Sequence, residues 1–183
     1  FLPPAIVRNF RQRRRNDMKQ YVIWKGIASV EIPDSFQAAT IGEKRKIFGN
    51  YRKLPDFVLL DRQHGIRISC VDTDRIENLK KMDIEQTAQF MSHIYKRTVP
   101  GYRCHGIYKR ADNDEVCAIL YTHYILNDTL YTMSLIYKEQ DTIHLLQCTC
   151  SNADTVEWHP VFKNIVESIC FNKKEKRHDK GTM

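Results

Sequence analysis

The chain has 183 residues, 42% of them hydrophobic, and a formal net charge of +7. This length and composition fit one globular domain of ordinary size and exclude an intrinsically disordered chain. Residues 1–20 carry +5 and residues 172–183 carry +3, whereas residues 21–171 sum to −1. Because a nucleic-acid-binding domain carries its basic patch on the folded surface, nucleic acid is disfavoured as a partner. We predict a basic N-terminal tail (1–20), a single domain (21–171) and a basic C-terminal tail (172–183).

The N-terminal tail combines an apolar start with an arginine cluster at positions 8–15. One interpretation takes Met18 as the true first residue. A second treats the arginines as the cytoplasmic flank of a lost membrane anchor, because such clusters follow membrane segments on the inner side. A membrane contact is expected only through these arginines. They could also bind RNA or an acidic protein, or form a solvated tail, which we favour.

The first half of the domain is predicted to consist mainly of short strands. Residues 27–32 form a strand that ends at a Pro-Asp turn, and residues 42–54 hold one helical turn around positions 43–47. Residues 57–60 and 66–71 form a hairpin, with Gly65 supplying the positive φ at its tip. Apolar residues alternate with polar ones along 66–71, which is typical of a half-buried strand.

The second half contains two helices and four strands. Asp83 is predicted to cap an amphipathic helix that ends before Pro100, and residues 102–108 form the next strand. The run 116–125 is almost entirely apolar, which predicts a central strand covered on both faces. Strands 130–138 and 142–150 follow, and Asp154 begins a closing helix that buries Trp158, Phe162, Ile165 and Ile169. Strands followed by one closing helix indicate an α+β domain.

Six cysteines lie at positions 70, 104, 117, 148, 150 and 170, and none forms a C-x-x-C pair. Most fall within strand-like apolar runs, where a free thiol behaves as a small hydrophobic side chain. We expect reduced, inert thiols and a cytoplasmic protein. No cofactor motif is present, because the sequence lacks the phosphate-binding glycine patterns and the zinc-protease motif.

Four segments resemble the PsbP-like fold family, which includes the photosystem II extrinsic protein, the Ran-binding nuclear import factor and small bacterial proteins. They are residues 29–36 (SVEIPDSF), 54–60 (LPDFVLL), the strand 131–137, and the helix 154–169 with its Glu-Trp-His-Pro sequence. The match runs from about Ser29 to Phe171. The resemblance implies a twisted, mainly antiparallel sheet of about six strands with helices packed on its faces, an αβα sandwich. It implies no shared catalytic residues. Family members act by binding, including chaperone adaptors for secreted bacterial effectors.

Two groups of residues offer alternatives to a binding role. Cys104 and His105 could form a nucleophile–base couple, but neighbours on a strand point to opposite faces. Cys148 and Cys150 could hold zinc together with Cys117 or His123 on a neighbouring strand, yet structural zinc sites use closely spaced cysteine pairs in loops. We therefore predict no catalytic residue and no metal, and keep an enzyme using a Cys or His on the sheet face as the alternative.

The predicted partner-binding surface is one face of the strand 130–138. Two helices are too narrow to cover both faces of a six-stranded sheet, so part of the sheet is expected to stay open. Exposed aromatics with a methionine suit an adaptable apolar contact with a protein partner or a second copy. The sequence thus predicts a non-enzymatic protein-binding or adaptor module whose partner contacts are Tyr131, Met133, Leu135 and Tyr137.

Overall fold

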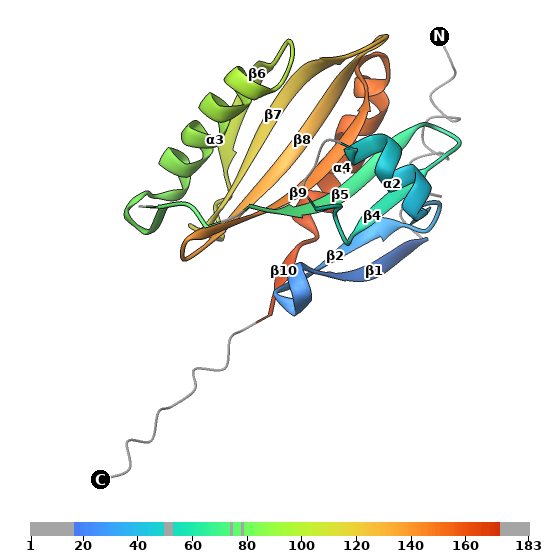
Figure 1. Ribbon diagram of the computed structural model, residues 1–183. Coiled ribbons are helices and arrows are strands. Elements are labelled where there is room, and N and C mark those ends of the chain that lie inside the picture. The colour runs from blue at the N-terminus through green and yellow to red at the C-terminus, as the bar shows by residue number, and fades with distance from the viewer. Residues whose placement is uncertain (1–16, 50–52, 74, 78, 173–183) are drawn as a thin grey trace.

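The computed structural model describes residues 17–49, 53–73, 75–77 and 79–172 (Figure 1). The arginine cluster at positions 8–15 and most of the predicted C-terminal tail therefore lie outside the described residues. None of the helices in the described part of the chain is long and apolar enough to cross a membrane.

A seven-stranded antiparallel sheet forms the centre of the molecule, with the order β3-β4-β5-β9-β8-β7-β6. It is one strand larger than the expected sheet, and the run 116–125 lies next to its edge rather than at its centre. The strands are β3 (Gln37–Ala38), β4 (Val58–Asp61), β5 (Ile66–Asp72), β6 (Arg103–Lys109), β7 (Val116–Ile125), β8 (Asp128–Glu139) and β9 (Thr142–Ser151).

A second, three-stranded sheet was not predicted. Its order is β1 (Met18–Ile23), β2 (Ala28–Pro33) and β10 (Cys170–Phe171), so the two ends of the described chain meet on β2. The predicted tail boundary at residue 20 is wrong, because residues 18–20 already pair with β2. This strand was missed because its apolar residues are too few to form a clear alternating pattern.

Of the three α-helices in the described part of the chain, α3 (Ile84–Thr98) follows its local sequence signals most closely. In α3 the Asp83 carboxylate accepts a hydrogen bond from Gln86 N at 2.7 Å, and the Gln86 side chain accepts one from Asp83 N at 3.1 Å. This reciprocal capping fixes the start of the helix. The predicted single turn near position 43 is instead a full helix, α2 (Ile41–Phe48), capped in the same way by Thr40. Asp154 occupies the cap position of α4 (Thr155–Glu167) without making the expected side-chain hydrogen bond.

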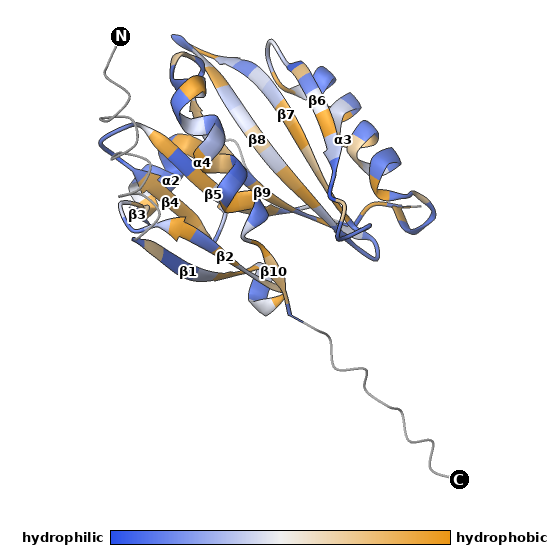
Figure 2. Ribbon diagram, turned by 180° about the vertical axis from the view of Figure 1, so that it is seen from behind, coloured by the Kyte–Doolittle hydropathy of each residue, from blue (hydrophilic) through white to orange (hydrophobic). Residues whose placement is uncertain are grey.

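The alternation of side chains along the strands divides the interior into two cores. One core lies under α3, where Ile84, Ala88 and Met91 pack on Cys117, Ile119 and Ile136. The other lies on the opposite face, where α4 and the small sheet pack together on β5, β8 and β9. Figure 2 shows the resulting change between hydrophobic and polar residues along β7 and β8. The expected αβα sandwich is thus confirmed, except that one of its outer layers contains the small sheet as well as α4.

Candidate functional site

The residues predicted to contact a partner lie in the core. Tyr131, Met133, Leu135 and Tyr137 are between 1% and 6% exposed. The Tyr131 hydroxyl is 2.7 Å from His159 Nδ1 on α4, and Tyr137 packs against Phe171 of the small sheet. The prediction is wrong because it counted only helices as cover and missed the second sheet. The opposite face of β8 is closed too, since Thr132, Ser134 and Ile136 are at most 1% exposed.

The cysteine and histidine groups are not assembled into a reactive couple or a shared ligand set. His105 lies at a bulge in β6, and its Nε2 is 3.0 Å from Thr122 Oγ1 rather than bonded to Cys104. Cys148 and Cys150 belong to the core beneath α4, whereas Cys117 belongs to the core beneath α3. The sheet itself therefore separates Cys117 from the other two thiols.

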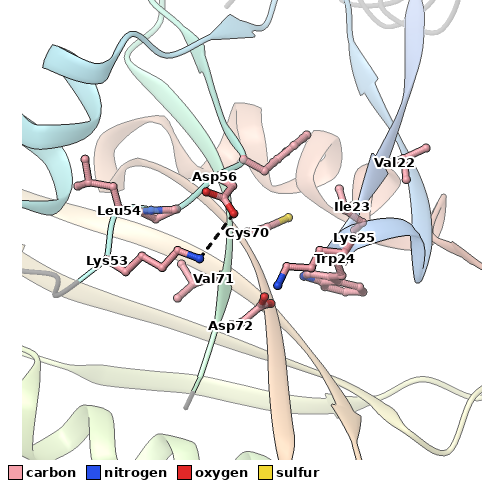
Figure 3. A pocket seen from close by; sticks show the side chains of 12 residues that line it. Val22, Ile23, Trp24, Lys25, Lys53, Leu54, Asp56, Cys70, Val71 and Asp72 are labelled. Carbon is pink, nitrogen blue, oxygen red and sulfur yellow. Dashed lines mark ion pairs between the residues drawn. The ribbon is translucent and has the colours of Figure 1, made fainter. Parts of the chain in front are cut away.

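A pocket with a volume of about 340 Å³ lies between the small sheet and the edge of the large sheet (Figure 3). Three segments supply its walls: the end of β1 with the turn that follows it, residues 53–57 before β4, and the end of β5. Its surface is largely apolar, from Trp24, Leu54, Pro55, Phe57 and Val71. This volume is at the lower end of the range found for ligand sites, and a single large side chain would fill much of it.

The turn beside this pocket has an unusual backbone. Trp24, Lys25 and Gly26, which form the helical turn η1 (Trp24–Gly26), have φ values of 51°, 56° and 96°. The left-handed conformation costs a residue with a side chain about 1–2 kcal/mol, so two such residues in succession represent strain. Strained backbone persists only where the surrounding structure holds it, and it is concentrated at functional sites.

Aromatic packing holds the turn in place. The Trp24 ring, which is 5% exposed, stacks on Tyr137 at 5.7 Å and on Phe171 at 6.2 Å. Its Nε1 donates a hydrogen bond to the Leu145 carbonyl at 3.4 Å, and the Asn172 side chain donates one to the Gly26 carbonyl at 2.5 Å. Lys25 is left exposed at the tip, where it lines this pocket and a second one of about 590 Å³ on the other side of the turn.

Charged groups lie around the apolar floor. Lys53 and Asp56 form a loose ion pair at 3.9 Å, and both side chains are about four-fifths exposed. Asp72 accepts a hydrogen bond from His144 Nδ1 at 2.8 Å when that nitrogen carries the proton. Lys44 of α2 donates to the carbonyl oxygens of Pro55 and Asp56, which fixes the wall opposite the turn. The Cys70 thiol lies at the base, where burial raises its pKa well above the usual value and keeps it protonated.

Sequence reasoning missed this site entirely. Its segments are separated by up to 50 positions along the chain, and the apolar residues in each look like ordinary strand or turn residues. One local signal was present: a tryptophan followed by Lys25 and a glycine directly after a short strand-like stretch. Gly26 there is typical of a tight turn, but nothing in the sequence indicates left-handed backbone at the two residues before it.

The fold can be compared with known proteins. Neither a protein-family model nor a curated protein matches the sequence. The cyanobacterial PsbP protein (CyanoP) of Synechocystis sp. PCC 6803 superposes with a TM-score of 0.61 at 9% identity, covering 85% of this chain and 93% of its own. The Ran-binding protein Mog1p of Saccharomyces cerevisiae gives 0.57 at 12% identity, covering 85% and 95%. LpqN of Mycobacterium tuberculosis, involved in cell envelope biogenesis, gives 0.52 at 11%, covering 89% and 96%.

The antiparallel sheet with helices on both faces defines the chain as an α+β sandwich. Its arrangement is the PsbP-like fold, shared over most of the chain with CyanoP and Mog1p. The expectation drawn from the four sequence segments is therefore confirmed for the fold. At identities of 9–12% the likeness concerns the fold alone.

Proposed function

We propose that the protein is a non-enzymatic binding module, an adaptor that holds a segment of a partner protein at the pocket beside the Trp24 turn. The observation that carries this proposal is the apolar pocket built against a strained, rigidly packed turn. A preformed apolar surface binds a partner's side chain without a large loss of conformational entropy. Charged groups around such a floor are typical of the polar rim of a protein interface.

Two further observations support the proposal. The structural neighbours include Mog1p, whose name describes it as Ran-binding, and this supports a protein-binding role for a chain of the same fold. The histidine beside Cys104 is engaged with Thr122, which does not favour the enzyme alternative. The cytoplasmic location that we propose is supported by six free thiols, four of which are buried.

Quantitative affinity purification with a matched pair of variants tests this function. Leu54→Lys places a charge on the floor of the pocket, whereas Leu126→Lys adds the same charge at a residue that is 97% exposed in the β7–β8 turn. We expect at least one protein to be retained by the wild type and by Leu126→Lys and to be lost with Leu54→Lys. The purified partner should then bind the three proteins in the same order. If Leu54→Lys folds and retains the same proteins, the pocket is not the binding site.

A further inference from the structure

We propose that β1 accepts an extended acidic segment of the partner as an additional strand, with one of its apolar side chains placed in the pocket beside the Trp24 turn. This inference rests on the proposed function and specifies how the partner binds. In this mode, main-chain hydrogen bonds along a sheet edge provide affinity, and pockets for alternate side chains provide specificity.

The pairing of β1 shows which of its backbone groups are available. Asp34 N donates to Asp17 O at 2.8 Å, and the register continues with Lys19 opposite Ile32 and Tyr21 opposite Val30. In an antiparallel pair, residues alternate between those that bond to the partner strand and those that point away. Lys19, Tyr21 and Ile23 therefore bond to β2, which leaves the N–H and C=O groups of Met18, Gln20 and Val22 directed outward.

The other edge of β2, which pairs with β10, gives an independent check of which β1 residues direct their backbone groups outward. Asn172 N donates to the Ile27 carbonyl at 2.9 Å, and Cys170 lies opposite Ser29 on β10. Odd-numbered residues of β2 thus bond to β10, so its even-numbered residues must bond to β1. Within the described residues β1 pairs only with β2, and it forms one edge of the small sheet. An exposed edge of this kind is a template for pairing with another chain.

The pocket lies at the C-terminal end of this edge. Val22 and Ile23 of β1 contribute to its wall, and Val22 is 66% exposed despite its apolar side chain. A strand that pairs with Gln20 and Val22 would bring every second side chain to the same side of the edge. Tyr21 and Ile23 face inward, and Tyr21 packs on Phe57 with their ring centres 5.8 Å apart. An incoming side chain opposite Tyr21 or Ile23 lies on this same face, so it can reach the apolar wall formed by Leu54 and Phe57.

The charges along the edge favour an acidic occupant. Lys19 on β1 and Lys25 at the turn form no ion pair with a described residue, although Lys19 lies 5.5 Å from the centre of the Tyr21 ring. The acids of the pocket are engaged, since Asp72 is paired with His144 and Asp56 with Lys53. Strand β1 carries a lysine and no acidic residue, so a second copy of β1 offers no complementary charge to Lys19.

The test begins with a displayed library of random twelve-residue peptides, selected on the full folded chain. We expect selected peptides rich in Asp and Glu that alternate with apolar residues. Amide hydrogen exchange of the complex, followed by NMR, then reports the binding mode. The amides of Gln20 and Val22 should exchange at least about tenfold more slowly with peptide bound. Those of Tyr21 and Ile23 are already bonded to β2 and should change little.

Two substitutions at one position give a matched control. Gln20→Pro removes an outward N–H, and proline is tolerated on an edge strand when its nitrogen faces solvent. Gln20→Ala keeps that N–H and loses the same side-chain hydrogen bond to Ser29. Gln20→Pro should weaken peptide binding about tenfold or more, and Gln20→Ala should leave it nearly unchanged. The exchange measurement uses the wild type, so the test holds even if Gln20→Pro proves unstable.

The possible outcomes separate the two proposals. Peptides that lose affinity with Leu54→Lys, but leave the exchange of the Gln20 and Val22 amides unchanged, would overturn strand addition and keep the pocket as a binding site. Peptides unaffected by Leu54→Lys and by Gln20→Pro would overturn both proposals. A library that yields no binding peptide would overturn the strand-addition proposal. Sedimentation that shows a dimer abolished by Gln20→Pro would identify a second copy as the occupant and would also overturn it.

Discussion

At the scale of one residue, Glu43 takes part both in the cap of α2 and in a hydrogen-bond network with Arg62. Its carboxylate accepts hydrogen bonds from Arg62 Nε at 2.8 Å and from Thr40 N at 2.7 Å. These contacts, led by the hydrogen bond to Arg62, lower the pKa of Glu43 from 4.5 to about 2. Arg62 also donates to the Gln37 side chain and the Ala38 carbonyl, so one guanidinium joins α2 to β3.

The lowered pKa of Glu43 predicts a pH-dependent stability. The ionised form is favoured in the folded state, so its contribution is present above about pH 4.5 and is lost as the pH falls toward 2. In thermal unfolding, Glu43→Gln should therefore have a lower Tm than the wild type at pH 7, and the difference should shrink between pH 4.5 and 2. Arg62→Met should show the same trend with pH, together with a pH-independent loss from its hydrogen bonds to Gln37 and Ala38. A difference that stays constant down to pH 2 would contradict this assignment.

The cysteines divide into two groups, which corrects the expectation that all are inert. Cys104 and Cys170 are exposed, whereas Cys70, Cys117, Cys148 and Cys150 are buried. Burial raises the pKa of Cys117 to about 11 and that of Cys150 to about 12. Both effects slow reaction, because the thiolate is the nucleophile and must be reached by the reagent.

A thiol reagent followed by intact-mass measurement checks this division. We expect two labels to add quickly to the folded protein and four more only after denaturation. The double variant Cys104→Ser and Cys170→Ser should remove the fast labels and serve as the control. Fast labelling of a third thiol would show that one of the buried sites opens.

At the scale of the element, the sequence signals for α3 and for the Gly65 hairpin were reliable. The capping of α3 and the Gly65 turn, at φ 69°, follow from residues within a few positions of one another. The strand β1 and the two-residue strands β3 and β10 could not be predicted in this way. They exist because distant segments pair with them: β10 lies opposite Ser29, and β3 lies opposite Leu59 and Leu60.

The position of β1 predicts different effects for two truncations. Removing residues 1–16 leaves all of β1 in place, whereas removing residues 1–20 deletes half of the strand and the Asp17–Asp34 hydrogen bond. The longer truncation should lower the Tm by several degrees more than the shorter one. Paired thermal unfolding scans measure the difference. Equal Tm values for the two truncations would show that β1 adds little to stability.

At the scale of the whole molecule, the sequence interpretation was wrong about which elements pack on the sheet and close its face. The alternation along 130–138 correctly placed Tyr131, Met133 and Leu135 on one face. Whether that face is open depends on which elements pack on it, and α4 shares it with a sheet whose third strand comes from the other end of the chain. The candidate pocket is unpredictable for the same reason, because it exists only where these layers meet.

The two cores make a direct prediction about stability. Met133→Ser removes a buried side chain and buries a hydroxyl, so it should lower the free energy of unfolding by about 2–4 kcal/mol. Leu126→Ser, at an almost fully exposed position, should change it by less than about 0.5 kcal/mol. Urea unfolding followed by circular dichroism compares the two. A small effect of Met133→Ser would show that this face tolerates water, as a binding surface would.

Because β10 completes the small sheet, it determines when this sheet can form during synthesis of the chain. Glu31 N donates to the Ser168 hydroxyl across a separation of 137 residues, and β10 follows directly after it. During synthesis, β1 and β2 leave the ribosome long before β10, and a two-stranded hairpin is marginally stable by itself. Contacts over such separations also form slowly. The β1 edge would therefore be able to bind a partner only once the C-terminal strand has been made. Unfinished chains would not capture the partner.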